Sequence, residues 1–368
     1  MKIGVPKEIK NNEYRVSLLP IGAELLTQAG HSVYVQTDAG KGSGISDDEY
    51  LQAGAQILPG LNEVYGSSDL IIKIKEPLEE EYALLREGQT LFTYLHLAAS
   101  RSLTQALLER KIIGFAYETL QLESGELPCL TPMSEVAGRM AVQEGAKYLE
   151  EPMHGRGILL GGVPGVAPAE VVILGAGVVG SNACKMAAGL GANVTVMDTN
   201  LNRLRFLDEI MPPNVHTLMS NRHTIGDAIS KADLVISSVL IRGAKSPCVI
   251  TREMLKSMKK GAVIVDVAID QGGSTECSRP TTHADPTFIV DDIVYYCVTN
   301  MPGAVPRTST YALTNATLPY ILKLASAEIA KLLSEDYPMR QSLNVYRGEL
   351  MIKEVAQAFN LPYKEPPW

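Results

Sequence analysis

An apolar segment that runs directly into a glycine-rich turn constrains this sequence most. Residues 171–174 read Val-Val-Ile-Leu and are followed by Gly175, Ala176, Gly177, Val178, Val179 and Gly180. An Ala-rich segment with helical spacing comes next. Gly175 permits a sharp turn, Gly177 a close approach of phosphate to the backbone, and Gly180 close helix–strand packing. The helix N-terminus adds free N–H groups and a positive dipole end, so the pattern predicts a phosphate-binding turn.

A carboxylate follows where a dinucleotide would need it. The next apolar strand, at 193–197, ends at Asp198, 23 positions after Gly175. An acid at this spacing accepts hydrogen bonds from the adenosine ribose. It also repels a 2′-phosphate, so NAD is favoured over NADP, although Arg203 weakens this preference slightly. The alternative is an ordinary strand–helix turn with Asp198 as a helix N-cap, but four aligned features favour the cofactor site.

Length and charge narrow the class of ligand. A chain of 368 residues, 46% of them hydrophobic, can form about two domains with separate cores. Its net charge of −8 gives no reason to expect nucleic acid or an anionic membrane as partner. No window reaches the roughly 18 apolar residues of a membrane span, and the first eight residues carry charge and proline instead of an apolar signal sequence. We therefore expect a cytoplasmic protein that binds small molecules.

The cysteines give no sign of a metal site. They are odd in number, scattered, and never spaced as C-x-x-C with a histidine pair nearby. We expect reduced, mostly buried thiols and no zinc. The five positions are Cys129, Cys184, Cys248, Cys277 and Cys297.

Two series of alternating strands and helices predict two parallel α/β layers. After Pro302 and Pro306 come helix-compatible segments at 309–334 and 349–359, and we expect these final helices to return to the first domain. A helix opens the second series at Ser134. Strands are predicted at 2–5, 32–36, 70–74, 90–95 and 112–116 in the first series, and near 171–174, 193–197, 234–237, 262–267 and 288–297 in the second.

Four polar residues follow predicted strands, and ligands of parallel sheets bind beyond the carboxyl ends of strands. Arg15 could hold a carboxylate through both arms of its guanidinium. Lys75 could present an ammonium to a carboxylate or a polarised carbonyl. His96 suits proton transfer near neutral pH, and Asp270 precedes a Gly-Gly pair that could let it face a nicotinamide.

Each of these residues also has a purely structural interpretation. Arg15 and Lys75 could be solvated surface charges, His96 a hydrogen-bonded structural histidine, and Asp270 the start of an Asx turn. The sequence alone leaves these alternatives open for each residue. Together, the four suit the oxidation of a small carboxylic acid that bears an amino or hydroxy group.

Seven longer motifs, spread over nearly the whole chain, carry a family resemblance. They are GVPKE at 4–8, EYRV at 13–16, KIKEP at 73–77, YLHLA at 94–98, PMSE at 132–135, LGGVPGV at 160–166 and NMPGAVP at 300–306. With these motifs the chain resembles the alanine dehydrogenases, a family shared with the N-terminal part of the proton-translocating nicotinamide nucleotide transhydrogenases.

The resemblance implies reversible, NAD-dependent oxidative deamination of L-alanine to pyruvate and ammonium by a homohexamer. It implies two Rossmann-like parallel-sheet domains with the active site in the cleft between them. The substrate domain would comprise 1–130 and 307–368, and the NAD-binding domain 131–306.

The resemblance also assigns roles to residues. Arg15 and Lys75 would bind the carboxylate and oxo group, while His96 and Asp270 would form the acid/base pair. The substrate methyl group would be bordered by Tyr94, Leu130 and Met133. Cofactor contacts would come from the residues of the 175–180 turn together with Ser134, Asp198, Arg203, Ser220, Val239, Leu240, Val267, Asn300 and Met301.

Two other functions remain as alternatives. An NAD(H)-binding subunit of a transhydrogenase is disfavoured, because Lys75 and His96 are both present and no membrane-anchoring extension follows. A non-catalytic NAD sensor would leave the convergent charged residues without a role.

Overall fold

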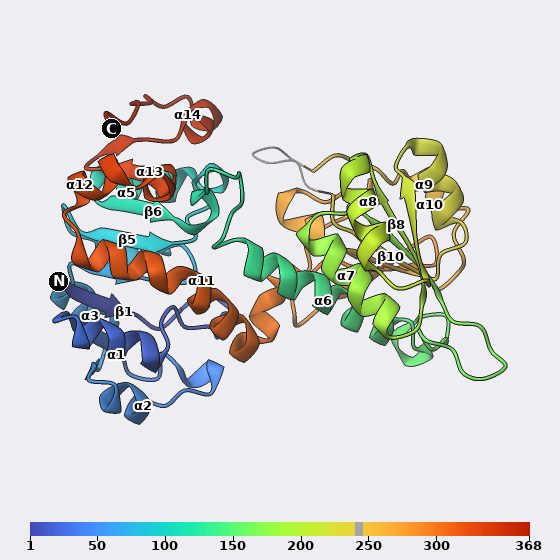
Figure 1. Ribbon diagram of the computed structural model, residues 1–368, viewed down its shortest axis with the longest axis horizontal. Coiled ribbons are helices and arrows are strands. Elements are labelled where there is room, and N and C mark those ends of the chain that lie inside the picture. The colour runs from blue at the N-terminus through green and yellow to red at the C-terminus, as the bar shows by residue number, and fades with distance from the viewer. Residues whose placement is uncertain (240–245) are drawn as a thin grey trace. The chain divides into compact units, whose positions relative to one another are not determined.

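The computed structural model describes residues 1–239 and 246–368, which form two compact units. Unit 1 comprises Met1–Met133 and Gly303–Trp368, and unit 2 comprises Ser134–Pro302. Each unit is built on a sheet dominated by parallel strands with helices packed on it (Figure 1), which confirms the predicted α/β class.

The sheet of unit 1 reverses its strand order between two neighbours, β1 and β4. Strands β2 and β3 extend it on one side of this reversal, and β5 and β6 on the other, all in parallel. Two late strands, β14 and β15, add to the β6 edge in antiparallel fashion. Across the sheet the order is β15 (Glu349–Leu350), β14 (Leu343–Tyr346), β6 (Ile113–Ala116), β5 (Thr90–Thr93), β4 (Leu70–Ile72), β1 (Lys2–Val5), β2 (Ser32–Gln36) and β3 (Gln56–Leu58).

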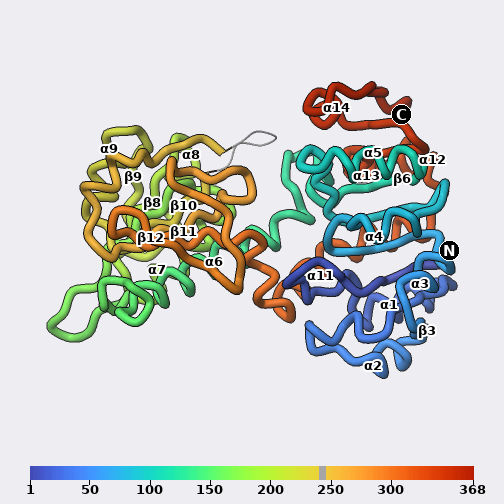
Figure 2. Tube along the Cα trace, turned by 180° about the vertical axis from the view of Figure 1, so that it is seen from behind, coloured from blue at the N-terminus to red at the C-terminus, as the bar shows by residue number. Residues whose placement is uncertain are grey.

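Helices from both ends of the chain cover this sheet. Helix α11 crosses one face (Figure 1), and α4 lies over the other in the view from behind (Figure 2). Pro306 opens α11, a first-turn position where its missing N–H costs no hydrogen bond. The helices of unit 1 are α1 (Pro20–Gln28), α2 (Asp47–Gln52), α3 (Leu61–Ser67), α4 (Glu79–Tyr82), α5 (Arg101–Glu109), α11 (Pro306–Ser326), α12 (Ile329–Glu335), α13 (Tyr337–Ser342) and α14 (Lys353–Phe359).

The sheet of unit 2 has the strand order of a doubly wound dinucleotide-binding fold. Its strands are parallel except for β12, which pairs with β13 in antiparallel fashion, and its order reverses between β7 and β10. The order is β12 (Thr287–Val290), β13 (Ile293–Tyr296), β11 (Val263–Asp266), β10 (Leu234–Ser237), β7 (Glu170–Leu174), β8 (Asn193–Asp198) and β9 (Val215–Met219). The helices are α7 (Val178–Gly189), α8 (Leu201–Ile210), α9 (Arg222–Ile229) and α10 (Arg252–Leu255), and α6 (Thr131–Tyr148) begins in unit 1.

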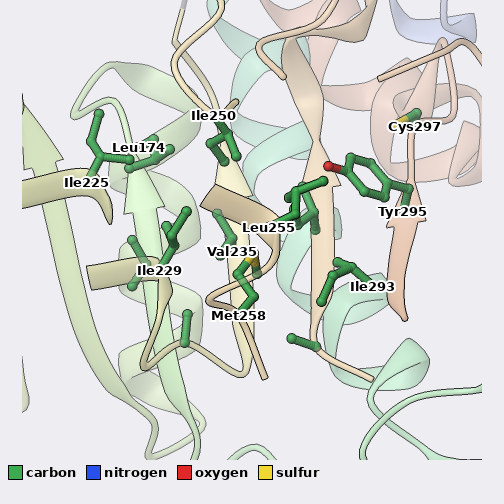
Figure 3. Close-up of a cluster of buried hydrophobic side chains, with 14 of the residues drawn as sticks. Leu174, Ile225, Ile229, Val235, Ile250, Leu255, Met258, Ile293, Tyr295 and Cys297 are labelled. Carbon is green, nitrogen blue, oxygen red and sulfur yellow. The ribbon is translucent and has the colours of Figure 1, made fainter. Parts of the chain in front are cut away.

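One hydrophobic cluster fixes α9 and α10 against this sheet (Figure 3). Alternate residues of a strand point to opposite faces, which sends Leu174 of β7 and Val235 of β10 to the side of Ile229 and Leu255. Burying each such side chain contributes about 1.5–3 kcal/mol. The helices therefore hold the strands, and the turns that follow them, in fixed places.

The predicted strand near 288–297 is wrong. It is a hairpin, in which β12 and β13 are joined by Asp291 and Asp292. Both aspartates have positive φ, 50° and 63°, as the two central residues of a type I′ turn require. Asp tolerates this conformation, but an Asp-Asp pair lacks the Asn-Gly or Asp-Gly signal from which such turns are predicted.

Other elements also depart from the predictions. The segment 309–334 is interrupted at Ala327, which is extended (φ −106°, ψ 153°), so α11 and α12 are separate helices. The predicted helix at 349–359 begins only at Lys353, because Glu349 and Leu350 form β15. Strands β3, β9, β14 and β15 were not predicted. All four lie toward sheet edges, where short or half-exposed strands show little apolar alternation.

Candidate active site

In unit 1, Arg15 and Lys75 follow the two strands between which the order reverses. Arg15 lies in the loop after β1, and Lys75 lies three residues after the end of β4. Ligands of doubly wound sheets bind at this reversal point, beyond the carboxyl ends of the strands. The topology therefore supports a ligand-binding role for both residues.

Arg15 is buried, and hydrogen bonds hold its guanidinium in one orientation. Its Nε donates to Glu13 Oε1 at 2.6 Å and its Nη2 to Glu13 Oε2, while Nη1 lies 3.0 Å from Met133 Sδ. The next residue is also fixed, because the Val16 N–H donates to Thr310 Oγ1 of α11. Burial alone would lower the pKa of Arg15, but the hydrogen bonds and charge of Glu13 raise it above its ordinary value. The guanidinium is thus a permanent, oriented cation.

Lys75 is anchored through its backbone, so its ammonium group can bind a ligand. Its C=O accepts from Thr93 Oγ1 at 3.0 Å. Within residues 1–239 and 246–368, no carboxylate oxygen lies within 4.0 Å of its Nζ. Burial and, next, the charge of Arg15 lower the pKa of Lys75. Two cations that disfavour one another make a good site for an anion.

His96 sits in a left-handed conformation (φ 47°) and is fixed by a residue that we did not predict, Glu118. Its backbone N–H donates to Glu118 Oε1 at 2.6 Å, and its Nδ1 lies 4.0 Å from the same oxygen. The imidazole stacks on Tyr94, with planes 5° apart and centroids separated by 5.7 Å. The side chain of His96 is 46% exposed, so the imidazole is accessible to a ligand.

Tyr94 connects His96 to the segment that carries two further predicted residues. Its hydroxyl donates to the Cys129 carbonyl oxygen at 2.6 Å, directly before Leu130 and a helical turn before Met133. Burial raises the pKa of Tyr94 well above its usual range, so it stays protonated. Unit 1 thus brings its predicted substrate residues and His96 together, with Tyr94 as a structural bridge.

In unit 2, the glycines of the 175–180 turn meet the requirements expected of them. Gly175 has a φ of +100°, and a Cβ on Gly180 would lie 1.7 Å from the Gly175 carbonyl oxygen. Gly177 is the N-cap of α7, and a Cβ there would meet no atom within 4 Å. Space is therefore open in front of the helix N-terminus, where a diphosphate would approach the backbone.

Asp198 connects this turn to the neighbouring strand ends. Its Oδ2 accepts from the Ala176 N–H at 2.6 Å, its Oδ1 from the Asn200 N–H at 2.7 Å, and its carbonyl oxygen from the Ser220 N–H at 3.0 Å. Two of the four acceptor sites of the carboxylate remain for a ribose. The N-cap of α8 is Asn200, so the interpretation of Asp198 as that cap is wrong. Arg203 Nε donates to the Ala176 carbonyl oxygen at 3.1 Å and so supports the turn.

The remaining predicted cofactor residues lie on α6 or follow other strands of unit 2. Helix α6 packs on the turn, since a Cβ on its Gly138 would lie 2.2 Å from the Val179 carbonyl oxygen, and Ser134 lies one helical turn earlier. Val239 follows β10, Val267 and Asp270 lie in the 3-10 helix η5 (Val267–Gln271) after β11, and Asn300 and Met301 come after β13. Leu240 lies outside the described residues. Asp270 is exposed and belongs to a different unit from His96.

Each unit contains a functional candidate that the sequence analysis missed. Glu13 stands within the EYRV motif, two residues before Arg15, and Glu118 stands two residues past the end of β6. The rule that selected Lys75 and His96, a polar residue beyond a strand end, would also have selected Glu118. Asp266, the last residue of β11, is 1% exposed and carries four hydrogen bonds.

These features of unit 2 fit a dinucleotide. Open space at Gly177, oriented N–H groups at the start of α7 and the free acceptor sites of Asp198 are what a diphosphate and a ribose require. Over the described part of the chain, no group of three His, Cys, Asp or Glu side chains could hold a metal ion. Nor does any helix within the described residues have the length and apolarity to cross a membrane.

Comparisons with known proteins agree with this geometry. The families described as alanine dehydrogenase/PNT, N-terminal domain and C-terminal domain match residues 4–137 and 141–353. The alanine dehydrogenase of Methanococcus maripaludis is 55% identical over 364 residues, covering 99% of this chain and 98% of the relative. That of Mycolicibacterium smegmatis is 52% identical over 365 residues, with the same coverage.

Solved structures give the same result. An L-alanine dehydrogenase superposes with a TM-score of 0.95 at 49% identity, covering 98% of this chain and 99% of the other. A transhydrogenase from Sinorhizobium meliloti superposes with a TM-score of 0.82 at 23% identity, covering 96% and 99%. The second likeness shows a shared fold only.

Proposed function

Because this chain belongs to the alanine dehydrogenase/PNT family, we propose that it is an L-alanine dehydrogenase that uses NAD. It would catalyse the reversible reaction of L-alanine, NAD⁺ and water to pyruvate, ammonium, NADH and a proton. The observation that carries this proposal is the identity of 52–55% to alanine dehydrogenases along 99% of the chain. The cation pair of Arg15 and Lys75, placed at a strand-order reversal, is the feature of the geometry that supports it.

Substrate binding is assigned to unit 1. Arg15, oriented by Glu13, would clamp the carboxylate, and Lys75 would hold the same carboxylate or the oxo group of pyruvate. Leu130 and Met133 would border the methyl group. Apolar walls of this kind discriminate an added methylene by only about 1–3 kcal/mol, so slow turnover of 2-aminobutyrate or serine is expected.

Proton transfer is assigned to His96 and Asp270. After the hydride leaves Cα, the substrate is an imine, and water adds to it to form a carbinolamine. His96 would exchange the proton of the substrate oxygen, while Asp270 would orient the water and assist the loss of ammonia. Glu118 and Tyr94 would hold His96 through its backbone N–H and its ring face.

The cofactor is assigned to unit 2. When bound, NAD supplies the acceptor for the hydride from Cα. The 175–180 turn would hold the diphosphate, and Asp198 would hold the adenosine ribose and exclude a 2′-phosphate. Arg203 uses its Nε–H to donate to the turn backbone, so this N–H does not serve a 2′-phosphate. This contact supports the preference for NAD over NADP. The remaining contacts with NAD would come from Ser134, Ser220, Val239, Leu240, Val267, Asn300 and Met301.

The experiment that tests this function is NADH formation by the purified protein. L-alanine should be compared with D-alanine, L-serine, L-lactate and no substrate, each with NAD and with NADP. Turnover that prefers L-alanine and NAD is expected. Tight NADH binding without turnover of any amino acid would instead favour the NAD-sensing alternative.

Assembly and location are part of the proposal. A homohexamer is supported by the family resemblance, and light scattering behind size-exclusion chromatography would test it. A cytoplasmic location is supported by the five cysteines, all of which are unpaired thiols, as is usual in a reducing compartment. Fractionation of cells that produce the protein would test the location.

A further inference from the structure

A buried carboxylate in unit 2 joins the segments that carry the proposed cofactor and proton-transfer residues. Asp266 ends β11 and is 1% exposed. Its Oδ1 accepts from the Ala268 N–H at 3.1 Å and lies 3.0 Å from Ser274 Oγ. Its Oδ2 accepts from the Ser274 N–H at 2.8 Å and from Ser278 Oγ at 2.5 Å. All four acceptor sites of the carboxylate are therefore used within the loop that follows it.

These bonds fix the turn that carries Asp270 at both of its ends. Ala268 lies two residues before Asp270 and Ser274 four residues after it. Between them the chain closes through Gly272 (φ 92°) and Gly273 (φ 77°). A Cβ on Gly273 would lie 2.6 Å from Ser278 Cβ and 3.2 Å from Asp266 Oδ2. Asp270 itself is exposed, so its backbone turn sets where its carboxylate can reach.

The same network reaches the glycine turn. The Ser274 hydroxyl, whose Oγ lies 3.0 Å from Asp266 Oδ1, also donates toward Ser237 Oγ at 2.6 Å, so its single proton is shared between these two acceptors. The next residue, Ser238, donates through its hydroxyl to the carbonyl oxygens of Leu174 (2.9 Å) and Gly175 (3.3 Å). A continuous path of hydrogen bonds and adjacent residues thus joins the end of β7 to the Asp270 turn.

The Asp266 carboxylate is surrounded by hydrogen-bond donors. Two of them are backbone N–H groups, which can only donate, and the other two are hydroxyls. Among the described residues, no lysine, arginine or histidine nitrogen lies within 4.0 Å of the carboxylate. A buried charge stabilised by a full set of hydrogen bonds holds its donors firmly, because each of them would otherwise lose its acceptor.

We propose that Asp266 is a positioning residue for the deamination reaction. It sets the place of Asp270 relative to the glycine turn. This inference rests on the proposed function, in which Asp270 orients water and assists the loss of ammonia. Asp266 does not itself contact substrate or cofactor in this role. It acts through the backbone at Ala268 and Ser274.

Asp266→Asn is the variant that tests the proposal. An amide has one acceptor oxygen and one NH2 group, so whichever way it turns, the N–H of Ala268 or of Ser274 faces a donor. One end of the Asp270 turn is therefore released. A misplacement of about 1 Å can cost on the order of 10²-fold in rate, and we expect a kcat loss of that order. The Kd of NADH, measured by fluorescence titration, should remain close to the wild-type value because Ser238 still holds the glycine turn.

Asp233→Asn is the matched control. Asp233 is also a buried aspartate of unit 2, but it precedes β10 and so lies at the opposite edge of the parallel sheet from Asp266. It binds the Glu170 N–H, Arg156 and Lys259. Its replacement should lower stability and leave kcat near the wild-type value.

The decisive readout combines Asp266→Asn with Asp270→Asn. If Asp266 acts through Asp270, the double variant should lose little more kcat than Asp270→Asn alone. Hydrogen exchange should also speed up at the amides of Ala268 or Ser274 in Asp266→Asn, and not in Asp233→Asn. If Asp266→Asn does not fold, Gly273→Ala disturbs the same turn from its other side and should show the same pattern.

Two results would overturn the proposal. One is a kcat for Asp266→Asn no lower than that of Asp233→Asn, while Asp270→Asn is strongly impaired. This outcome would leave the proposed function intact. The other is a fold loss of kcat in the double variant that equals the product of the fold losses of Asp266→Asn and Asp270→Asn measured singly. Normal L-alanine turnover by Asp270→Asn would also refute the role of Asp270, and with it the positioning role of Asp266, but it would leave the proposed L-alanine dehydrogenase activity intact.

Discussion

Gly177→Ala separates the cofactor role of the glycine turn from its structural role. A Cβ at Gly177 would meet no atom within 4 Å, and its φ of −70° is one that alanine adopts without strain. The protein without cofactor should therefore fold as well as wild type. Alanine restricts the unfolded chain, which contributes about 0.4–1 kcal/mol, but it is a poorer N-cap than glycine by a similar amount, so the free energy of unfolding should change little.

Binding of NADH, in contrast, should become much weaker. The added methyl group occupies the open space in front of α7 that the diphosphate needs in order to reach the backbone N–H groups. Loss of one charge-assisted hydrogen bond costs about 1.5–3 kcal/mol, which corresponds to NADH binding about 10- to 150-fold weaker. Fluorescence titration with NADH and urea unfolding of the same preparation would measure both quantities.

Two other glycines of α7 serve as controls. Gly189, at the end of the helix, also has open space, so Gly189→Ala should stabilise the protein and leave NADH affinity unchanged. Gly180→Ala should impair both stability and binding, because its Cβ would lie 1.7 Å from the Gly175 carbonyl oxygen. Normal NADH affinity in Gly177→Ala would refute the assignment of this turn to the diphosphate.

Three further variants test the substrate side. His96→Ala should lower kcat by about 10²- to 10⁴-fold with little change in the Kd of NADH, whereas lost NADH binding would show that its role is mistaken. Arg15→Lys cannot form the bidentate pair with Glu13, and kcat/KM for L-alanine should fall about 10- to 150-fold, the equivalent of a charge-assisted hydrogen bond; an unchanged kcat/KM would contradict the clamp. Lys75→Met should abolish turnover yet raise the free energy of unfolding at pH 7, because burial and Arg15 lower the pKa of Lys75 and the folded state therefore holds its charge at a cost. The free energy of unfolding of the wild type should therefore rise as the pH rises from the lowered pKa of Lys75 toward about 10.4. Urea unfolding from pH 7 to 10.5 should show that this rise is absent in Lys75→Met.

The predictable features of this molecule are local in sequence. The strand, the three glycines and the following helix are continuous, so the turn at 175–180 and its place after β7 could be predicted from the residues. Lys75 and His96 follow strongly apolar strands, which places them at the carboxyl ends of the strands of the sheet. The hairpin turn at Asp291 and Asp292 is also local, but its aspartates carry no glycine signal and were read as part of one strand.

The features that were missed depend on distant pairs. Glu118 becomes significant because its carboxylate meets the backbone of His96, 22 residues earlier. Thr310 holds the Arg15 loop across 294 positions of sequence. Strands β14 and β15 are short and join a sheet whose other strands lie far earlier in the chain. Hydrophobic periodicity gives no information about such pairings.

In the proposed reaction, hydride passes from Cα of L-alanine to a nicotinamide. L-alanine deuterated at Cα should therefore be incubated with the protein and NAD, and the NADH formed should be analysed by mass spectrometry. We expect one deuterium in each NADH formed and none when unlabelled L-alanine is used in deuterated water. NADH without deuterium from the labelled substrate, or no NADH at all, would refute hydride transfer from Cα.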